Sequence, residues 1–549
     1  MLRSAFTPNR TECNRDHDKT PNNPKPIPGP GGAGRSKYPP PTAKTGTPNA
    51  VGLRLFSSTT SFCYWRFSRF EAYRRDGEIE LAGSACHGSL LEDFVMDTIE
   101  LRAAAARLRG LHGRFAPCFG RRECREHSLG YVRGLLLGQE RKSVEPMALV
   151  FGGPSEVEPE IKRSVALAWQ RFLTVSPWEA QAVQREIQAV FNEEFVPSAR
   201  EWAIGTVGVI DGSGFVKQGR ESVGVQRQWC GRLGKVENCQ VGVFLVGVTP
   251  AGNALLEHQL YLPETWAADA ARRKKTRVPA EITFQTKPEI AATLLGRSMV
   301  RFDWVTADEE FGRDGAFLDA LEHSEQRYLV EVPCDTTVWT SKPTGQTPDA
   351  FVRQVRDVAA MLPDRAWETI KLREGAKGPL AFDFARLRIW SVRHRHAGPP
   401  LWLVIRRSLE KDPEVKYYLS NAEVEMPLRP MAQVTGTRWR VEEFFEDGKG
   451  QLGMSQYEAR SWTSWHHHMS LVALAHLFVT QTRRDLGRQV PDLTLDMALR
   501  LLRAALPRPQ LSLQDAANLV DYHLAHNKQA QASHRKRWLA KHLNPVQRK

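Results

Sequence analysis

The chain has 549 residues, of which 41% are hydrophobic and 25% are charged, an ordinary composition for a soluble globular protein with room for several domains. Its longest apolar stretch, Met469–Val479, is interrupted by His476 and is too short to span a bilayer, which excludes a membrane-spanning class. The net charge of +14 favours a polyanionic partner, most simply nucleic acid and less often an acidic membrane surface, unless it only reflects a basic proteome.

The first part of the chain reads as a tail. Residues 20–48 are rich in Pro, Gly, Ser and Lys and cannot bury enough apolar surface to fold. A normal helical pattern begins only at Met96, so we interpret 1–95 as a disordered or dispensable extension. Met1–Arg10 lacks the apolar core of a secretory signal, and the eight cysteines are scattered without a disulfide-like framework. A reducing cytoplasm is the expected location.

Residues 96–200 have a helical and basic pattern. Arginines recur through 118–136, which predicts a helix pair that faces DNA. Cys118, Cys124 and His127 resemble part of a zinc site, but no fourth ligand stands at a sensible spacing, so unliganded thiols are the preferred interpretation.

From residue 203 the pattern changes to alternating β-branched residues, which predicts a strand that ends at Asp211. A hairpin around the turn 249–253 follows. We then expect a basic loop at 272–277, a helix at 289–299, a strand running into Asp308, a helix at 316–324 and a strand at 326–333. This mixture of strands and helices indicates an α/β class.

Residues 334–430 are strand-rich, with predicted strands at 384–392, 401–409 and 415–421. A helix containing "RWRVEEFFEDGKGQLGM" begins near Arg438, and a buried helix begins near residue 463. Residues 485–549 are predicted to be helical and basic. The cations of 528–549 either contact phosphate or form a solvated tail.

Three acidic residues stand out from these elements. Asp211 and Asp308 each end a predicted strand and are soon followed by glycine, which lets a ligand approach the backbone. Glu442 shares a helical stripe with Arg438 and Lys449 by the three-and-four spacing. Carboxylates brought together repel one another, and a divalent cation with a preference for oxygen ligands, Mg²⁺ or Mn²⁺, removes that repulsion.

Two such ions roughly 3.5–4 Å apart can activate water or a 3′-hydroxyl and stabilise the leaving oxygen of a phosphodiester. Arg438 and Lys449 would grip the flanking phosphates, and Arg440 is a further DNA-binding candidate. Taken singly, each acid has a simpler interpretation: an Asp before Gly is commonly a turn, and a helical Glu is commonly solvated. The neighbours Glu443, Glu446 and Asp447 could also be named in place of Glu442.

The exposed or buried state of four tryptophans also bears on DNA binding. Each of these side chains could stack on a DNA base or pack in the protein core, and packing is the preferred interpretation. The four residues are Trp229, Trp439, Trp462 and Trp465.

The chain resembles the DDE transposases of bacterial insertion sequences, in particular the insertion sequence seven-oh-one group, related to the insertion sequence four type. The resemblance covers roughly residues 97–480 and rests on "VIDGSGFVKQG", "RLGKVENCQVGVFLVG", "VTADEEFG" and "RWRVEEFFEDGKGQLGM". The family signature is Tyr, two residues, Arg, three residues, Glu, six residues, Lys. Here it falls on Thr435, Arg438, Glu442 and Lys449, so the spacing is kept and threonine replaces the aromatic hydroxyl.

The resemblance implies an RNase H-like mixed sheet with flanking helices, interrupted by a β-rich insertion, with helical N- and C-terminal parts. It implies that Asp211, Asp308 and Glu442 are both the catalytic residues and the ligands of two Mg²⁺ or Mn²⁺ ions. The expected segments are a tail (1–95), a helical DNA-binding domain (96–200), the first part of the catalytic core (201–333), the β-rich insertion (334–430), the rest of the core (431–484) and a basic helical part (485–549).

The resemblance further implies a bacterial, nucleoid-associated enzyme that cleaves and joins DNA. Its partners would be double-stranded DNA, as terminal inverted repeats and as target, and a second copy of the chain in a homodimer that synapses two ends. Two alternatives remain at this point: a catalytically inactive DNA-binding relic or repressor, and an RNase H-like nuclease that cuts but never joins.

Overall fold

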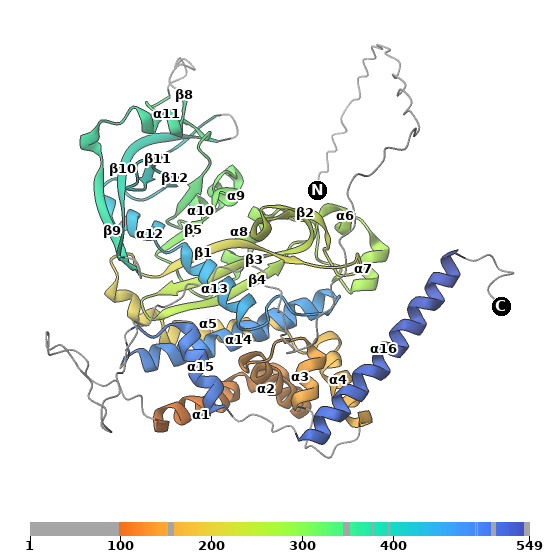
Figure 1. Ribbon diagram of the computed structural model, residues 1–549. Coiled ribbons are helices and arrows are strands. Elements are labelled where there is room, and N and C mark those ends of the chain that lie inside the picture. Colours follow the sequence, from red (N-terminus) through yellow and green to blue (C-terminus); the bar gives the residue numbers. More distant parts are fainter. Residues whose placement is uncertain are drawn as a thin grey trace, which may run out of the picture. The chain divides into compact units, whose positions relative to one another are not determined.

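The structure is a computed structural model that describes residues 98–151, 159–343, 352–375, 378–393, 396–488, 490, 492–506 and 512–542 (Figure 1). The predicted tail at 1–95 and the proposed start at Met96 lie outside these residues, as do positions 543–549 of the basic C-terminus. No helix in the described residues is both long and apolar enough to cross a membrane.

The predicted helical pattern of 96–200 is confirmed. The helices are α1 (Thr98–Phe115), α2 (Arg122–Leu136), α3 (Val144–Phe151), α4 (Pro159–Thr174) and α5 (Ala180–Glu194), with short 3₁₀ turns at Ala116–Phe119 and Val196–Glu201. The long helix α14 (Trp462–Gly487) packs against α2, α4, α5 and the strand β4 (Gly252–Leu260), so it is buried along most of its length. Tyr131 of α2 and His468 of α14 share a buried hydrogen bond of 2.8 Å. The N-terminal helices and α14 therefore share one core with the first sheet.

The first sheet is mixed, as the fold class requires. It contains β1 (Val207–Val216), β2 (Gln226–Cys230), β3 (Lys235–Thr249), β4 and β5 (Trp304–Ala307) in the order β2-β3-β1-β5, with β4 also paired to β3. β1 is antiparallel to β3 and parallel to β5. The mixed α/β architecture confirms the predicted RNase H-like class. A short 3₁₀ turn, Gly231–Leu233, links β2 to β3.

Two local predictions for this sheet are wrong. β1 does not end at Asp211 but continues to Val216, because β3 begins at Lys235 and offers hydrogen-bond partners as far as the pair Val216↔Cys239. The expected basic loop at 272–277 is mostly the helix α7 (Ala270–Thr276). Asp269 caps this helix by accepting a hydrogen bond of 2.9 Å from the backbone N–H of Arg272.

Of the remaining helices around the first sheet, the two longer ones follow the predictions at 289–299 and 316–324, and the two helices of four residues each were not predicted. In chain order, the remaining helices are α6 (Glu264–Ala267), α8 (Lys287–Arg297), α9 (Glu309–Gly312) and α10 (Gly315–His323). α8 starts with a complete capping box between Thr286 and Glu289. Phe317, Leu318 and other apolar residues of α10 are buried in the core that lies beside β5.

The strand-rich pattern of 334–430, together with the strand predicted at 326–333, forms a second, antiparallel sheet. Its strands are β6 (Leu329–Val332), β7 (Thr337–Trp339), β8 (Val352–Gln354), β9 (Glu368–Gly375), β10 (Gly378–Arg393), β11 (His396–Arg407) and β12 (Val415–Ser420), with helix α11 (Val355–Ala360) and a 3₁₀ turn at Asp364–Ala366. The order is β6-β12-β11-β10-β7-β8, and β9 pairs with β10. β6 pairs with β12, and a parallel bridge between Val305 and Tyr328 connects β5 to the residue before β6. The two sheets therefore meet at β6.

The quoted stretch at 438–454 begins with the predicted helix. α12 (Leu428–Thr435) is followed by α13 (Trp439–Gly450), and α15 (Leu495–Ala505) and α16 (Leu513–His542) come after α14. A Cβ atom on Gly448 would lie 3.0 Å from Met454 Sδ, so glycine lets the chain turn back closely against α13. Nothing in the described surroundings requires glycine at position 450. The division of the chain into six segments stays a prediction.

Candidate active site

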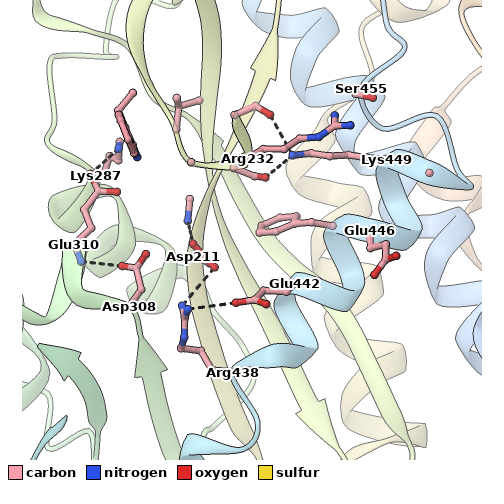
Figure 2. A pocket seen from close by; sticks show the side chains of 18 of the residues that line it. Asp211, Arg232, Lys287, Asp308, Glu310, Arg438, Glu442, Glu446, Lys449 and Ser455 are labelled. Carbon is pink, nitrogen blue, oxygen red and sulfur yellow. Dashed lines mark hydrogen bonds and ion pairs between the residues drawn. The ribbon is translucent and has the colours of Figure 1, made fainter. Parts of the chain in front are cut away.

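Asp211, Asp308 and Glu442 line one cleft of about 940 Å³ (Figure 2). Asp211 comes from the middle of β1, and Asp308 follows β5 and caps α9, where its Oδ1 accepts a hydrogen bond of 3.0 Å from the Glu310 amide. Glu442 lies in the first turn of α13. Residues from three elements that are far apart in the sequence therefore face the same space.

Arg438 connects these acids. Its guanidinium lies 3.6 Å from Asp211 Oδ2 and 3.3 Å from Glu442 Oε1, and a third ion pair of 3.5 Å joins it to Glu331 Oε2 on β6. The Arg438, Asp211 and Glu331 side chains are mostly buried, whereas 61% of the Glu442 side chain is exposed. Arg438 thus neutralises acids from β1, β6 and α13 in one place.

The acids of the cleft disfavour one another's ionisation. Burial raises the pKa of Asp211 to about 7, and the charge of Asp308 adds to this effect. Arg438 and the Gly212 amide, which donates to Asp211 Oδ1 at 2.6 Å, partly oppose it. Burial also raises the pKa of Asp308, and Arg438 opposes that shift as well. Such a group of carboxylates gains from additional positive charge.

The residues present fit a hard divalent cation by their chemistry. The cleft offers carboxylate oxygens, and a guanidinium stands among them as the positive charge. In the described part of the chain, no three His, Cys, Asp or Glu side chains lie in a group ready to hold a metal ion. In this cleft Arg438 pairs with both Asp211 and Glu442.

Lys449 holds α13 against β1. Its ammonium donates hydrogen bonds to Ser213 Oγ (2.7 Å) and to the Gly214 carbonyl (3.1 Å), and it lies 5.0 Å from the centre of the Phe215 ring. Burial lowers the pKa of Lys449 to about 8, and the nearby charge of Arg232 contributes. Lys449 therefore lines the cleft, but its hydrogen bonds are made to the protein itself.

The other charged residues of α13 face differently. Arg440 pairs with Glu443 at 2.9 Å and stacks over Trp439, and neither Arg440 nor Glu443 lines the cleft. Burial and nearby acids raise the pKa of Asp447 to about 7 on that same side of the helix, near Arg483. Glu446 lines the cleft together with Glu442, but only Glu442 pairs with Arg438. The geometry therefore favours Glu442 among the neighbouring acids.

Sequence reasoning missed several residues of this cleft. Lys287 pairs with Glu310 at 2.5 Å on one wall, and Arg232 lies near Lys449 on another (Figure 2). The sequence could have indicated Glu310, because this acid stands only two positions after Asp308. The sequence gives no indication of Glu331, because it is the pairing of β6 that places this residue beside Arg438.

The glycines near the aspartates serve packing as much as access. A Cβ atom on Gly312 would lie 2.0 Å from the Glu331 carbonyl oxygen, and one on Gly214 would lie 2.8 Å from Cys230 Sγ. Gly212 has room, because the nearest atoms to its Cβ would lie 3.9 Å away or more. The expectation that glycine opens the site to a ligand therefore applies to Gly212 alone of these three.

The four tryptophans divide into two groups. Trp462 and Trp465 are buried, in agreement with core packing. Trp229 is 58% exposed and lines the cleft, and Trp439 carries Arg373 and Arg440 over its ring. Thr435, which replaces the signature tyrosine, is buried, and its hydroxyl donates to the Ala432 carbonyl at 2.7 Å. That hydroxyl is thus used inside α12.

Comparison with known proteins shows what this chain is similar to. Residues 114–379 match the family model of the DDE superfamily endonucleases, a range that contains Asp211 and Asp308 and ends before Glu442. A curated protein of Microchaete diplosiphon, described as "Probable transposase for insertion sequence element IS701", is 31% identical over 183 residues. These residues make up 32% of this chain, and the match spans 43% of that protein, less than half of its length. The resemblance to insertion-sequence DDE proteins is thereby confirmed.

Proposed function

We propose that this chain is the transposase of an insertion sequence, because residues 114–379 match the DDE superfamily endonucleases and a probable transposase of insertion sequence element IS701 is a partial relative. The observation that carries the proposal is the convergence of Asp211, Asp308 and Glu442 on one cleft around Arg438. A superfamily of this kind generally uses a divalent metal. The proposed substrates are the terminal inverted repeats of the element and a target duplex.

In this proposal Asp211, Asp308 and Glu442 are the residues that would hold two Mg²⁺ or Mn²⁺ ions. When bound, such ions activate the attacking oxygen and stabilise the leaving oxygen of a phosphodiester. Arg438 keeps the carboxylates close together against their mutual repulsion. Arg438, Lys449 and Arg440 are the proposed DNA contacts, of which Arg438 and Lys449 line the cleft.

The reaction has two displacements at phosphorus. In the first, a water oxygen bonds to phosphorus at the transposon end, and the 3′-oxygen leaves and takes up a proton. In the second, the oxygen of the freed 3′-hydroxyl loses its proton and bonds to a target phosphorus, while the target's own 3′-oxygen leaves and takes up a proton to become a new 3′-hydroxyl. Neither step needs a tyrosine or serine nucleophile, so no covalent protein–DNA intermediate is expected. We propose a homodimer as the form that synapses two ends, in the bacterial cytoplasm at the nucleoid.

A nicking assay on the DNA that flanks the gene tests the proposal. The full chain should nick inverted-repeat DNA in the presence of Mg²⁺ or Mn²⁺ and should then yield strand-transfer products. Glu442→Ala should abolish cleavage and leave DNA binding largely intact, whereas the matched control Glu443→Ala, outside the cleft, should stay active. An inactive Glu443→Ala beside an active Glu442→Ala would mean that the wrong carboxylate has been chosen.

The same assay separates the two alternatives. A chain that binds the repeats and never nicks them with either metal is a DNA-binding relic or repressor. A chain that nicks them and gives no joined product is an RNase H-like nuclease without transfer activity.

A further inference from the structure

A second cleft, which we call the α7 cleft, is lined by Lys275 and Thr276 of α7. Its volume is about 630 Å³, and it is formed by α4, α7, residue 221 and the segment before α14. Its charged lining residues are Glu221, Lys275, Arg277, Glu458 and Arg460. The other lining residues are small, polar or apolar, so charge dominates what this cleft can recognise.

Positive charge is in excess around the α7 cleft. Lys275 forms an ion pair with Glu221, and Arg460 and Arg272 are close enough to lower the pKa of Glu221 further. Lys274, the neighbour of Lys275, is exposed. Within the described residues, the Lys274 and Arg460 side chains have no ion-pair or hydrogen-bond partner. Three cations and two acids therefore line the cleft, and Glu458 is already paired with Arg141, so Arg460 and the neighbouring Lys274 remain available to an external anion.

The α7 cleft and the proposed active site share a wall. Ser455 and Gln456 line the active-site cleft, and residues 458–461, which follow directly, line the α7 cleft. Two hydrogen bonds hold the backbone of this segment. Lys217 Nζ donates to the Tyr457 carbonyl at 2.8 Å, and the Val223 amide donates to the Arg460 carbonyl at 2.9 Å. Residues 455–461 therefore separate the proposed active site from the cations of α7.

We infer that the α7 cleft binds the phosphate backbone of the duplex that flanks the scissile phosphate. This inference rests on the proposed function and extends it, because it gives the DNA a direction across the protein. The partner is duplex DNA rather than a small anion, since the cations extend from Arg460 along α7 and the cleft adjoins the active site. Arg273 is excluded from the contact, because it donates to the Pro279 carbonyl at 2.9 Å and fixes the loop after α7.

The test compares two duplexes that carry the same transposon end. One extends about 10 base pairs from the scissile phosphate, one helical turn, and the other extends about 30 base pairs, three turns. The variant combines Lys274→Ala, Lys275→Ala and Arg460→Ala in the full chain. Its control combines Arg353→Ala, Arg365→Ala and Lys411→Ala, three exposed cations of the β-rich sheet region.

Affinity is measured as a function of salt. Each phosphate that the protein no longer neutralises reduces the salt slope by about 0.9, so the fall in affinity between about 50 and 200 mM salt becomes about 3.5-fold smaller. We expect the α7 variant to show this change and to bind the long duplex more weakly, while its binding of the short duplex changes less. The control variant should behave as the unsubstituted chain does.

A variant that should strengthen DNA binding distinguishes lost phosphate contacts from a folding defect. Glu221→Gln removes one of the two acids that line the α7 cleft and should strengthen binding of the long duplex. If the unsubstituted chain binds the long duplex better than the short one, yet the α7 and Glu221 variants leave both affinities unchanged, the inference is wrong. If the unsubstituted chain binds neither duplex at any salt concentration, the proposed function itself fails.

Discussion

Replacing Arg438 with glutamine removes the cation that lies between the acids of the proposed active site. Its ion pairs with Asp211 (3.6 Å) and Glu331 (3.5 Å) are mostly buried, so their loss should matter. The pair with Glu442 is exposed on the glutamate side and should contribute little. Removing one partner of a buried ion pair costs roughly 3–5 kcal/mol, because the other charge stays buried and unpaired.

The expected loss for Arg438→Gln lies near the lower limit of that range, about 3 kcal/mol of unfolding free energy at pH 8. The reason is that Asp211, whose pKa burial already raises to about 7, can take up a proton instead of remaining charged. Below pH 7 this protonation should make the loss smaller. The control is Arg440→Gln, on the same helix, which removes a pair outside the cleft and should cost about 1 kcal/mol or less.

Denaturant unfolding with and without Mn²⁺ measures both effects. A ligand that binds only the folded chain stabilises it by about 2.7 kcal/mol at a concentration 100 times its Kd. Since the guanidinium no longer competes for the carboxylates, Mn²⁺ should stabilise Arg438→Gln more than it stabilises the unsubstituted chain. The reasoning is refuted if Arg438→Gln is as stable as Arg440→Gln, or if Mn²⁺ stabilises the variant no more than the parent.

Other substitutions test the surroundings of the site. Glu331→Gln should lower the unfolding free energy by about 3 kcal/mol, because it removes the buried carboxylate that Arg438 (3.5 Å) and Lys416 (2.9 Å) share; equal stability in urea would contradict this. Asp447→Asn should stabilise the chain by about 1–2 kcal/mol at pH 8, after allowance for solvent screening, and hardly at pH 4. Its folded pKa is raised above the unfolded one, so the carboxyl destabilises the fold increasingly as pH rises towards 7; a pH-independent difference in melting temperature would refute the assignment. Gly312→Ala should cost about 1–3 kcal/mol, because the new methyl meets the Glu331 carbonyl oxygen, and an unchanged thermal melt would disprove that packing.

Much of the fold could be predicted from periodicity. The buried strands β3 and β4 and the helices α8, α10, α13 and α14 have strong apolar patterns, and the structure confirms them. The helix α7 was harder to predict, because its consecutive cations resemble a solvated loop. The residue that caps it, Asp269, stands outside the basic run. The end of β1 was also missed, because a glycine-rich continuation carries no apolar alternation and is held by pairing with β3.

The site could be predicted in part. Asp211, Asp308 and Glu442 were identified from strand ends, helix spacing and family resemblance, and they do line one cleft. The role of Arg438 as their shared counter-ion could not be read from the sequence, since it depends on side-chain geometry across separate elements. The role of Glu331 could not be predicted for the same reason, because the sequence of one strand does not show which strands lie beside it.

The position of β6 limits how this protein can be rearranged. Its residues hydrogen-bond to β12, while the preceding Tyr328 bridges to β5, so the strand is a seam between the two sheets. A graft that exchanged the β-rich part from residue 334 onward would leave β6 behind and expose the edge of β12. Chimaeras between relatives should therefore include β6 in the exchanged segment. They should also keep a carboxylate at position 331, so that the exchanged sheet packs correctly against the rest of the protein.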